Sequence, residues 1–281
     1  MYLYQNEFVS KEQVRISPDD RGYYFGDGVY EVFRVYNGIL FEAEGHYERL
    51  EKSARDVRIP LPYSTRHLDK LLNQLIRLNE LAEGTVYMQI TRGAAPRSHP
   101  FPAQAEPVLM AYTTEMARPF ETMEKGITAV TMEDIRWLRC DLKTLNLLPN
   151  VMAKQHALDQ GAHEVILHRS GTVTECSASN MMIVKNGELR THPANHLILH
   201  GITRAFVLQL ARQLNLPVRE EAFTLDDLRT ADEAFITGTT TEITPIIRID
   251  KQTVGQGVPG PVTVKLQRAF EERLPKAAIK S

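Results

Sequence analysis

A proline-containing segment at residues 117–121 separates two long runs of alternating helix and strand patterns, and it constrains the fold more than any other feature of this chain. Proline fixes φ and lacks an N–H donor, so this segment is unsuited to a helix interior or an interior strand and is predicted to be a linker. The 281 residues are enough for two domains of roughly 100–200 residues each. We therefore predict an α/β (α+β) protein with a small α/β domain over residues 1–118 and a larger domain over residues 122–281.

Hydrophobic periodicity predicts the elements on either side of the linker. Two alternating segments, 29–36 and 39–42, flank Asn37-Gly38, a turn pair that adopts positive φ at little cost and indicates a β-hairpin. Leucines recur at helical spacing behind Ser64, which predicts a capped helix over 64–81. The other predicted helices are 45–58, 148–160, 202–214, 224–231 and 261–273, and the other predicted strands are 85–92, 107–114, 126–133, 163–168, 172–175, 180–185, 188–192 and 233–237.

Composition excludes several classes of function. With 43% hydrophobic and 24% charged residues, the chain has an ordinary globular profile, and its net charge of -2 gives no reason to expect nucleic acid or an anionic membrane as partner. Cys140 and Cys176 are too few for a disulfide framework and lack metal-ligand spacing, so free thiols and no metal site are expected. No apolar run reaches membrane-spanning length and the first residues lack a signal-peptide pattern, which predicts a cytoplasmic location.

One lysine, Lys143, stands among leucines at positions 142, 145, 147 and 148. Lysine is rarely buried unless it is paired, and apolar surroundings lower its pKa. Such a lysine is a candidate amine for Schiff-base chemistry of the kind used with pyridoxal phosphate. The alternative is a loop lysine that extends its ammonium group into solvent. The rest of the chain must therefore supply the other parts of a cofactor site.

A pyridoxal phosphate site also needs an anion for the ring nitrogen and donors for the phosphate. Glu175, at the end of a predicted strand, is a residue type that keeps a pyridine nitrogen protonated. Phosphate is bound by backbone N–H groups at a helix N-terminus, by hydroxyls and by a cation. Residues 201–203 open a predicted helix, residues 237–241 offer hydroxyls after a strand, and Arg49 is a candidate cation. Each feature also has a structural alternative: a turn, strand packing or a solvated helix face.

Recognition of a substrate carboxylate is predicted in the loop that follows residue 92. Arg97 and His99 lie beyond a stretch rich in glycine, alanine and proline. Arginine suits this role because its guanidinium group binds a carboxylate through two parallel hydrogen bonds. The alternative is a surface loop with incidental charge.

Taken together, these motifs resemble those of the fold-type IV pyridoxal phosphate enzymes, and among them the D-amino-acid aminotransferases. The similarity extends over essentially the whole chain, with the motifs in the family's order. The resemblance implies a small N-terminal α/β domain and a larger C-terminal pseudo-barrel domain that binds pyridoxal 5'-phosphate. The motifs that carry it are residues 20–31, 91–93, 97–99, 134–141 with Lys143, 174–175, 201–204 and 239–245.

The resemblance implies a role for each matching residue around the cofactor. Lys143 would bind the cofactor covalently and act as the catalytic residue, and Glu175 would face the ring nitrogen. Ala178 and Gly238 stand where the family has serines and Cys176 where it has a glycine, which subtracts hydroxyls around the cofactor. The other residues implied to contact the cofactor are Arg49, Ser179, Leu199, Ile202, Thr203 and Thr239.

The resemblance also implies a reaction, which is transamination between a D-amino acid such as D-alanine and a 2-oxo acid such as 2-oxoglutarate, with ping-pong kinetics through pyridoxamine phosphate. Tyr30, Arg97 and His99 would bind the substrate carboxylate. Arg97 and His99 would reach the neighbouring subunit's site, so the catalytic unit would be a homodimer. The alternatives of the same fold are a branched-chain L-aminotransferase, an (R)-amine transaminase and an aminodeoxychorismate lyase, and the pair Arg97 and His99 argues for the D-amino-acid subgroup.

Overall fold

The computed structural model describes residues 1–276, and the chain divides into two compact units. The first unit comprises Met1–Arg118, the segment Leu142–Asn146 and the described residues from Pro275 onward. The second comprises Pro119–Asp141 and Leu147–Leu274. The segment that carries Lys143 therefore belongs to the first unit, although it follows the predicted linker. Among residues 1–276, no helix has the length and apolar character that crossing a membrane requires.

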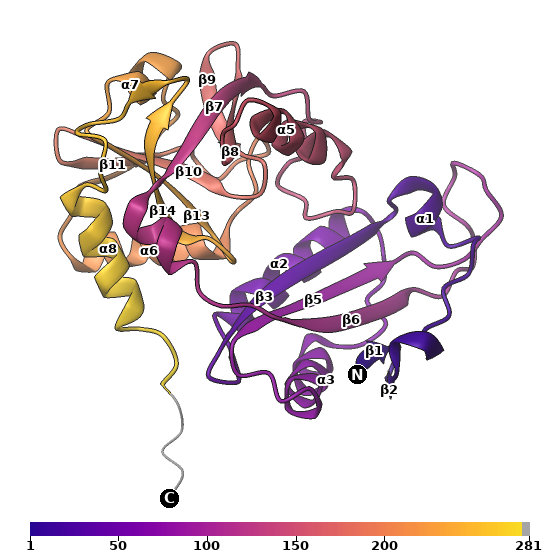
Figure 1. Cartoon of the computed structure of the whole chain (residues 1–281). Helices are drawn as coiled ribbons and strands as arrows, with labels where there is room; N and C mark the ends of the chain where they lie inside the picture. The colour runs from indigo at the N-terminus through magenta and orange to yellow at the C-terminus, as the bar shows by residue number, and fades with distance from the viewer. Residues whose placement is uncertain (277–281) are drawn as a thin grey trace, which may run out of the picture. The chain divides into compact units, whose positions relative to one another are not determined.

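The first unit is built on a six-stranded antiparallel sheet in the order β2-β1-β6-β5-β3-β4 (Figure 1). Two helices, α2 (Ala43–Asp56) and α3 (Thr65–Leu78), pack their apolar residues against one face of this sheet. Because side chains alternate along a strand, the residues between the core positions point to the opposite face. The strands are β1 Tyr2–Tyr4, β2 Glu7–Val9, β3 Gly28–Tyr36, β4 Ile39–Leu40, β5 Gly84–Thr91 and β6 Val108–Glu115.

The hairpin and the capped helix predicted for this unit are confirmed. Asn37 and Gly38 both have positive φ, 50° and 76°, and they connect β3 with β4. Asparagine and glycine tolerate this region best, which is why the pair specifies the turn. Ser64 caps α3, because its Oγ accepts a hydrogen bond from the His67 N–H at 3.3 Å.

A row of stacked tyrosines crosses the face of this sheet that lies opposite the helices. The ring of Tyr2 stacks on Tyr112, Tyr112 on Tyr87, and Tyr87 on Tyr30, with centroid distances of 5.4, 5.2 and 5.7 Å. Four neighbouring strands each contribute one ring. Tyr2 lies opposite Tyr112 and Tyr112 opposite Tyr87 in the register, whereas Tyr30 is the diagonal neighbour of Tyr87. The row fixes the ring of Tyr30.

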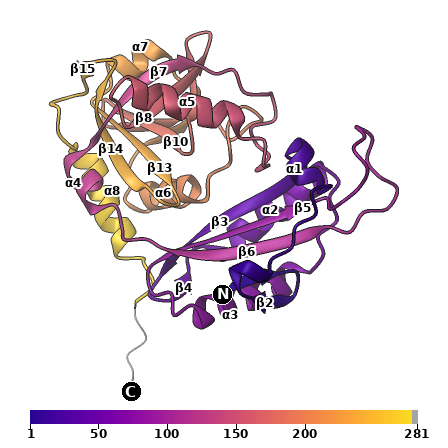
Figure 2. The same cartoon turned by 45° about the vertical axis from the view of Figure 1, so that its right-hand side comes forward.

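The second unit contains a nine-stranded mixed sheet in the order β12-β11-β10-β13-β14-β7-β8-β9, with β15 paired to β14 (Figure 2). Helix α5 (Leu148–Asp159) packs on β7 and β8, whereas α6 (Ile202–Gln213) and α8 (Pro261–Glu271) pack on each other and on β13. A short helix, α7 (Leu225–Arg229), precedes β13. The strands are β7 Ile127–Glu133, β8 Glu164–Arg169, β9 Thr172–Cys176, β10 Asn180–Lys185, β11 Glu188–Thr191, β12 Val218–Glu220, β13 Glu233–Gly238, β14 Glu242–Ile249 and β15 Gln252–Thr253.

Several elements differ from those predicted. The expected linker continues as a helix, α4 (Phe120–Lys125), because Pro119 occupies its N-cap position, where a missing N–H costs nothing. Strand β14 was not predicted because it contains Pro245, yet its pairing with β7 starts only at Ile246, after the proline. Short elements with little periodicity were also missed, namely β1, β2, η1 (Lys11–Gln13), α1 (Arg21–Phe25), β12 and β15.

Candidate active site

Lys143 lies in a short segment that adds to the edge of β3. The Tyr30 N–H donates to the Lys143 carbonyl at 3.1 Å, and the Lys143 N–H donates to Ser53 Oγ of α2 at 3.1 Å. Strand β4 pairs only with Val35 and Tyr36 at the far end of β3, so the edge near Tyr30 is open to the Lys143 segment. The backbone of Lys143 is thus fixed by both the sheet and a helix of the first unit.

The ammonium group of Lys143 faces an aromatic ring. Its Nζ lies 4.2 Å from the ring centroid of Tyr30, a distance typical of a cation–π contact. Lys143 itself is half-buried, and Leu148 is 69% exposed. Of the leucines around Lys143, Leu142 is buried, Leu145 and Leu147 are half-buried, and Leu148 is exposed. The Tyr30 ring provides a further apolar surface beside the ammonium group.

Arg49 is buried on the other side of β3, where it pairs with a carboxylate that the sequence interpretation missed. Its Nε donates to Glu31 Oε1 at 2.8 Å and its Nη2 to Glu31 Oε2 at 2.7 Å, while His46 Nδ1 lies 2.7 Å from Glu31 Oε2. Burial alone would raise the pKa of Glu31, but the charge and hydrogen bonds of Arg49 lower it to about 2. The signal in the sequence is an acidic residue at a core position of a mostly apolar strand.

Arg97 and His99 are exposed, and both contact the same ring. The Arg97 guanidinium carbon lies 5.3 Å from the centroid of the Phe25 ring, and the His99 ring packs edge-on to it at 5.7 Å. The buried Arg21 of α1 holds their loop by donating to the carbonyls of Ser98 and His99 at 2.5 and 3.4 Å. Helix α1 thus organises the loop, and Arg21 is a further residue that the sequence interpretation did not single out.

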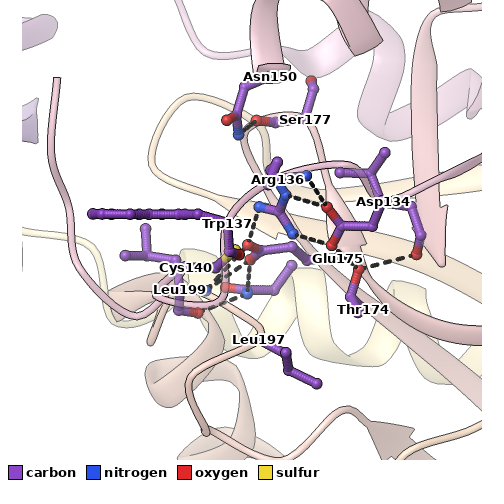
Figure 3. Close-up of polar contacts among 12 residues, drawn as sticks. Asp134, Arg136, Trp137, Cys140, Asn150, Thr174, Glu175, Ser177, Leu197 and Leu199 are labelled. Carbon is purple, nitrogen blue, oxygen red and sulfur yellow. Dashed lines mark hydrogen bonds and ion pairs between the residues drawn. The ribbon is translucent and has the colours of Figure 1, made fainter. Parts of the chain in front are cut away.

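In the second unit, Glu175 is a buried carboxylate surrounded by donors (Figure 3). Only 4% of Glu175 is exposed. Arg136 Nη1 donates to Oε1 at 2.6 Å, Asn180 Nδ2 donates to Oε2 at 2.9 Å, and the Leu199 N–H lies 3.0–3.1 Å from both oxygens. Glu175 comes from β9, Asn180 begins β10, and Leu199 precedes α6. Leu199 therefore contacts Glu175 through its backbone.

The charge of Glu175 depends on two opposing effects. Burial raises the pKa of its carboxyl group to about 7, while the charge and hydrogen bond of Arg136 and the Leu199 N–H act against that rise. Arg136 is itself held by Asp134, which accepts from its Nε at 2.9 Å and from its Nη2 at 2.8 Å. Arg136 and Asn180 were not singled out as site residues from the sequence. Arg136 lies 39 residues from Glu175, and the turn that brings Asn180 back to Glu175 across five residues is not specified by periodicity.

The start of α6 and the end of β13 present donors that remain available. Gly201 is the N-cap of α6 without a side-chain cap, and Ile202 and Thr203 are its first helical residues, so the N–H groups of that turn are available to an anion. A side chain at Gly201 would overlap Asn180 Oδ1. Thr239 follows β13 and is half-buried. Within the described part of the chain, the hydroxyls of Thr237 and Thr241, on either side of Thr239 in sequence, are buried without a hydrogen-bond partner. So is the hydroxyl of Ser179, whose Cβ would lie 3.4 Å from a Cβ at Gly238.

Comparison with known proteins places this arrangement in a family. The model of the family described as amino-transferase class IV matches residues 28–249. The chain belongs to the class IV aminotransferases. This aminotransferase is 47% identical to the D-alanine aminotransferase of Staphylococcus aureus (strain MSSA476) over 274 residues, which cover 97% of each chain.

Solved structures of class IV relatives share the whole fold. The Escherichia coli branched-chain amino acid aminotransferase superposes with a TM-score of 0.94 at 28% identity and covers 99% of this chain and 96% of its own. A branched-chain amino acid aminotransferase from T.th., complexed with N-(5'-phosphopyridoxyl)-L-glutamate, superposes with a TM-score of 0.91 at 26% identity. That match covers 96% of this chain and 92% of the other. The mixed α/β fold predicted from the sequence is therefore that of this family.

Proposed function

We propose that this class IV aminotransferase transfers the amino group of a D-amino acid, such as D-alanine, to a 2-oxo acid, such as 2-oxoglutarate, with pyridoxal phosphate as its cofactor. The observation that carries the proposal is the 47% identity to a D-alanine aminotransferase over nearly the full length. Branched-chain aminotransferases share the fold at only 26–28% identity. Arg97 and His99 further support the D-amino-acid assignment within the fold.

The residues of the second unit fit pyridoxal phosphate. An ionised carboxylate has about four acceptor positions, and the donors on Glu175 are Arg136, Asn180 and the Leu199 N–H, so capacity remains for a ring N–H. The uncapped start of α6 and the unpartnered hydroxyls of residues 179, 237 and 241 provide donors of the kind that a phosphate binds. Buried donors without partners are costly, which favours a site that a ligand completes.

The proposed cofactor residues divide by chemistry. Ile202, through its N–H, with Thr203, Thr239 and the cation Arg49, would hold the phosphate, and Leu199 and Ser179 would lie against the cofactor. Glu175 would hold the proton on the ring nitrogen. When bound, pyridoxal phosphate supplies an electron sink that weakens the Cα–H bond of an attached amino acid.

Lys143 would carry the cofactor covalently and then move the substrate proton. Its Nζ, once freed by the incoming amino acid, would accept the proton from Cα as a neutral amine. Tyr30 would fix the direction from which Nζ approaches the Cα proton, because its ring lies under Nζ and its backbone pairs with that of Lys143. The Cα–H bond must point at Nζ, so the side on which the carboxylate is held decides which enantiomer reacts.

Tyr30, Arg97 and His99 would hold that carboxylate. Arg97 and His99 are exposed in one chain, which supports the proposal that they act in the site of a second subunit in a homodimer. Helix α5 supports association as well, since its outward residues include Leu148, Val151 and Met152.

The test is to mix the purified holoenzyme with D-alanine, L-alanine or L-leucine and follow the absorbance of the cofactor. Conversion of the cofactor to its pyridoxamine form is expected with D-alanine alone. Consumption of 2-oxoglutarate in an amount equal to that of D-alanine would separate transamination from a lyase reaction. The Lys143→Ala variant should retain the fold, judged by circular dichroism, and lose turnover by about 10³-fold or more. Equal conversion with L-leucine, or normal turnover by Lys143→Ala, would contradict the proposal.

A further inference from the structure

A buried chain of charges runs from Asp134 through Arg136 to Glu175 in the second unit (Figure 3). Asp134 accepts two hydrogen bonds from the Arg136 guanidinium group, and Arg136 Nη1 reaches Glu175 at 2.6 Å. The side chains of Asp134 and Arg136 are 0% and 7% exposed. Three different stretches of the chain thus meet here: the loop after β7, which holds both Asp134 and Arg136, and strands β8 and β9, which hold Arg169 and Glu175.

Asp134 is positioned so firmly that Arg136 cannot turn away from Glu175. Its carboxylate also accepts from the Arg136 N–H at 3.0 Å, from Thr174 Oγ1 at 3.0 Å and from Arg169 Nε at 3.2 Å. Arg169 in turn donates to the Arg136 carbonyl at 3.1 Å. A guanidinium group is planar, so two bonds to one carboxylate fix the direction of its third nitrogen. That direction points Nη1 at Glu175.

Every polar group that contacts Glu175 within the described residues is a donor: Arg136, Asn180 and the Leu199 N–H. A protonated carboxyl group would need an acceptor, so these contacts favour the ionised form. The other titratable groups that act on or are affected by Glu175 are Asp134, Cys140 and Cys176, and burial raises the pKa of both thiols, so they stay neutral. Arg136 is therefore the cation that balances the Glu175 charge, while Asp134 acts against it.

We propose that Arg136 is a positioning residue of the reaction, which keeps the Glu175 carboxylate ionised and immobile so that its remaining acceptor position can take the N–H of the cofactor ring. This role rests on the function proposed above, because only a protonated ring nitrogen needs an ionised partner there. Without Arg136, burial would favour the protonated carboxyl group, which cannot hold a proton on the ring.

The test measures the protonation of Glu175 directly in the cofactor-free protein. Infrared difference spectra between the wild type and Glu175→Gln isolate the carboxyl stretch of this residue and give its titration midpoint. Arg136→Gln should raise that midpoint by about one pH unit or more, since an opposite charge in contact lowers a carboxyl pKa by about 1–3 units. Arg136→Lys, which keeps the charge but not the planar fork, should raise it less.

Arg190→Gln is the matched control, because Arg190 of β11 is a half-buried arginine of the second unit that pairs with Glu188. Among the hydrogen bonds and ion pairs of residues 1–276, it contacts none of Asp134, Arg136 and Glu175. Its Glu175 midpoint should stay within a few tenths of a unit of the wild type. In the holoenzyme, the acid limb of the kcat/KM profile for D-alanine should move to higher pH with Arg136→Gln, because the ionised form is lost as pH falls. The acid limb of Arg190→Gln should stay in place.

The outcomes separate this inference from the proposed function. A folded Arg136→Gln protein with an unchanged Glu175 midpoint would overturn the role of Arg136, even if the wild type transaminates D-alanine. If Arg136→Gln does not fold, an unchanged midpoint in Arg136→Lys would overturn it equally. Conversely, a raised midpoint in a protein whose wild type leaves D-alanine untouched would preserve the charge relation and refute the proposed reaction.

Discussion

At the scale of single residues, the proposed role of Arg97 distinguishes between substrate classes. Its guanidinium group is exposed beside Phe25, with no buried structural role, so its removal should affect recognition and leave the fold intact. We expect Arg97→Ala to lower kcat/KM for D-alanine by about 10- to 100-fold, the loss of a charged hydrogen bond, while cofactor affinity stays unchanged. Steady-state kinetics and cofactor titration measure both. Arg66→Ala, an exposed arginine on α3, is the control, and equal kinetics in the two variants would rule out Arg97 as a carboxylate ligand.

Glu175 should leave a signature in the pH dependence of stability. Its pKa rises from 4.5 in the unfolded chain to about 7 in the fold, so the neutral form favours folding below pH 4.5 and this contribution is lost as pH rises through 7. This loss amounts to ~3 kcal/mol of unfolding free energy. Compared with Glu175→Gln, the cofactor-free wild type should lose that much unfolding free energy between pH 4.5 and pH 7 in denaturant titrations. The same pH dependence of the unfolding free energy in the wild type and in Glu175→Gln would contradict this prediction. Glu48→Gln is the control, because Glu48 is an exposed residue of α2.

The sequence indicates the candidate site residues by their type and position, but it does not indicate which residues contact them. Lys143 and Glu175 attract notice because a cation among leucines and an acid at a strand end are unusual. The contacts that define them, Tyr30 for the lysine and Arg136 for the glutamate, join residues far apart in the chain. Such pairs depend on sheet register and loop path, which local periodicity does not specify.

At the scale of elements, prediction succeeded where one local pattern decides and failed where neighbours decide. The Asn37-Gly38 turn and the Ser64 cap act within a few residues, and both are present as predicted. Strand β14 was missed because Pro245 argues against a strand. Its neighbour β13 nevertheless pairs with β14 up to Pro245, and β7 pairs with β14 from Ile246 onward. Helix α1 was missed because five residues give no helical period.

The junction of α6 with β10 yields an element-scale prediction. Gly201 has φ -66° and ψ 133°, which any residue can adopt, so its small size is required by the closeness of Asn180 rather than by its backbone. Gly201→Ala should push Asn180 from Glu175 and Leu199 and cost about 1–3 kcal/mol of stability, as overpacking does. It should also weaken cofactor binding.

Gly161→Ala is the matched control, because no described atom lies within 4 Å of a Cβ there and the cost comes only from its φ of 69°. Both variants should lose stability in denaturant titrations, but only Gly201→Ala should raise the Kd for pyridoxal phosphate. Equal Kd values would show that the start of α6 does not contribute to the cofactor site.

At the scale of the whole molecule, the two units are not two consecutive parts of the sequence. The sequence places Lys143 after the linker, yet Leu142–Asn146 belongs to the first unit, where it pairs with β3. The reason is that β4 covers only the end of β3, and an open strand edge attracts a further segment. A division drawn at one point of the sequence cannot represent a segment that returns in this way. The lysine therefore reaches Tyr30 through topology rather than through local sequence.

The last prediction concerns assembly. Helix α5 exposes Leu148, Val151, Met152 and Leu158, and a helix with an apolar outward face is expected to be covered by a partner. We expect Val151→Glu to shift the proposed homodimer toward monomer in sedimentation velocity, because a charge would be buried without a partner. Val258→Glu is the control, because Val258 lies outside α5 but is exposed to the same degree as Val151, 61% against 59%. Val151→Glu should also lose transaminase activity in proportion to dissociation, because Arg97 and His99 would no longer reach a second site; an active monomer would contradict their action across subunits.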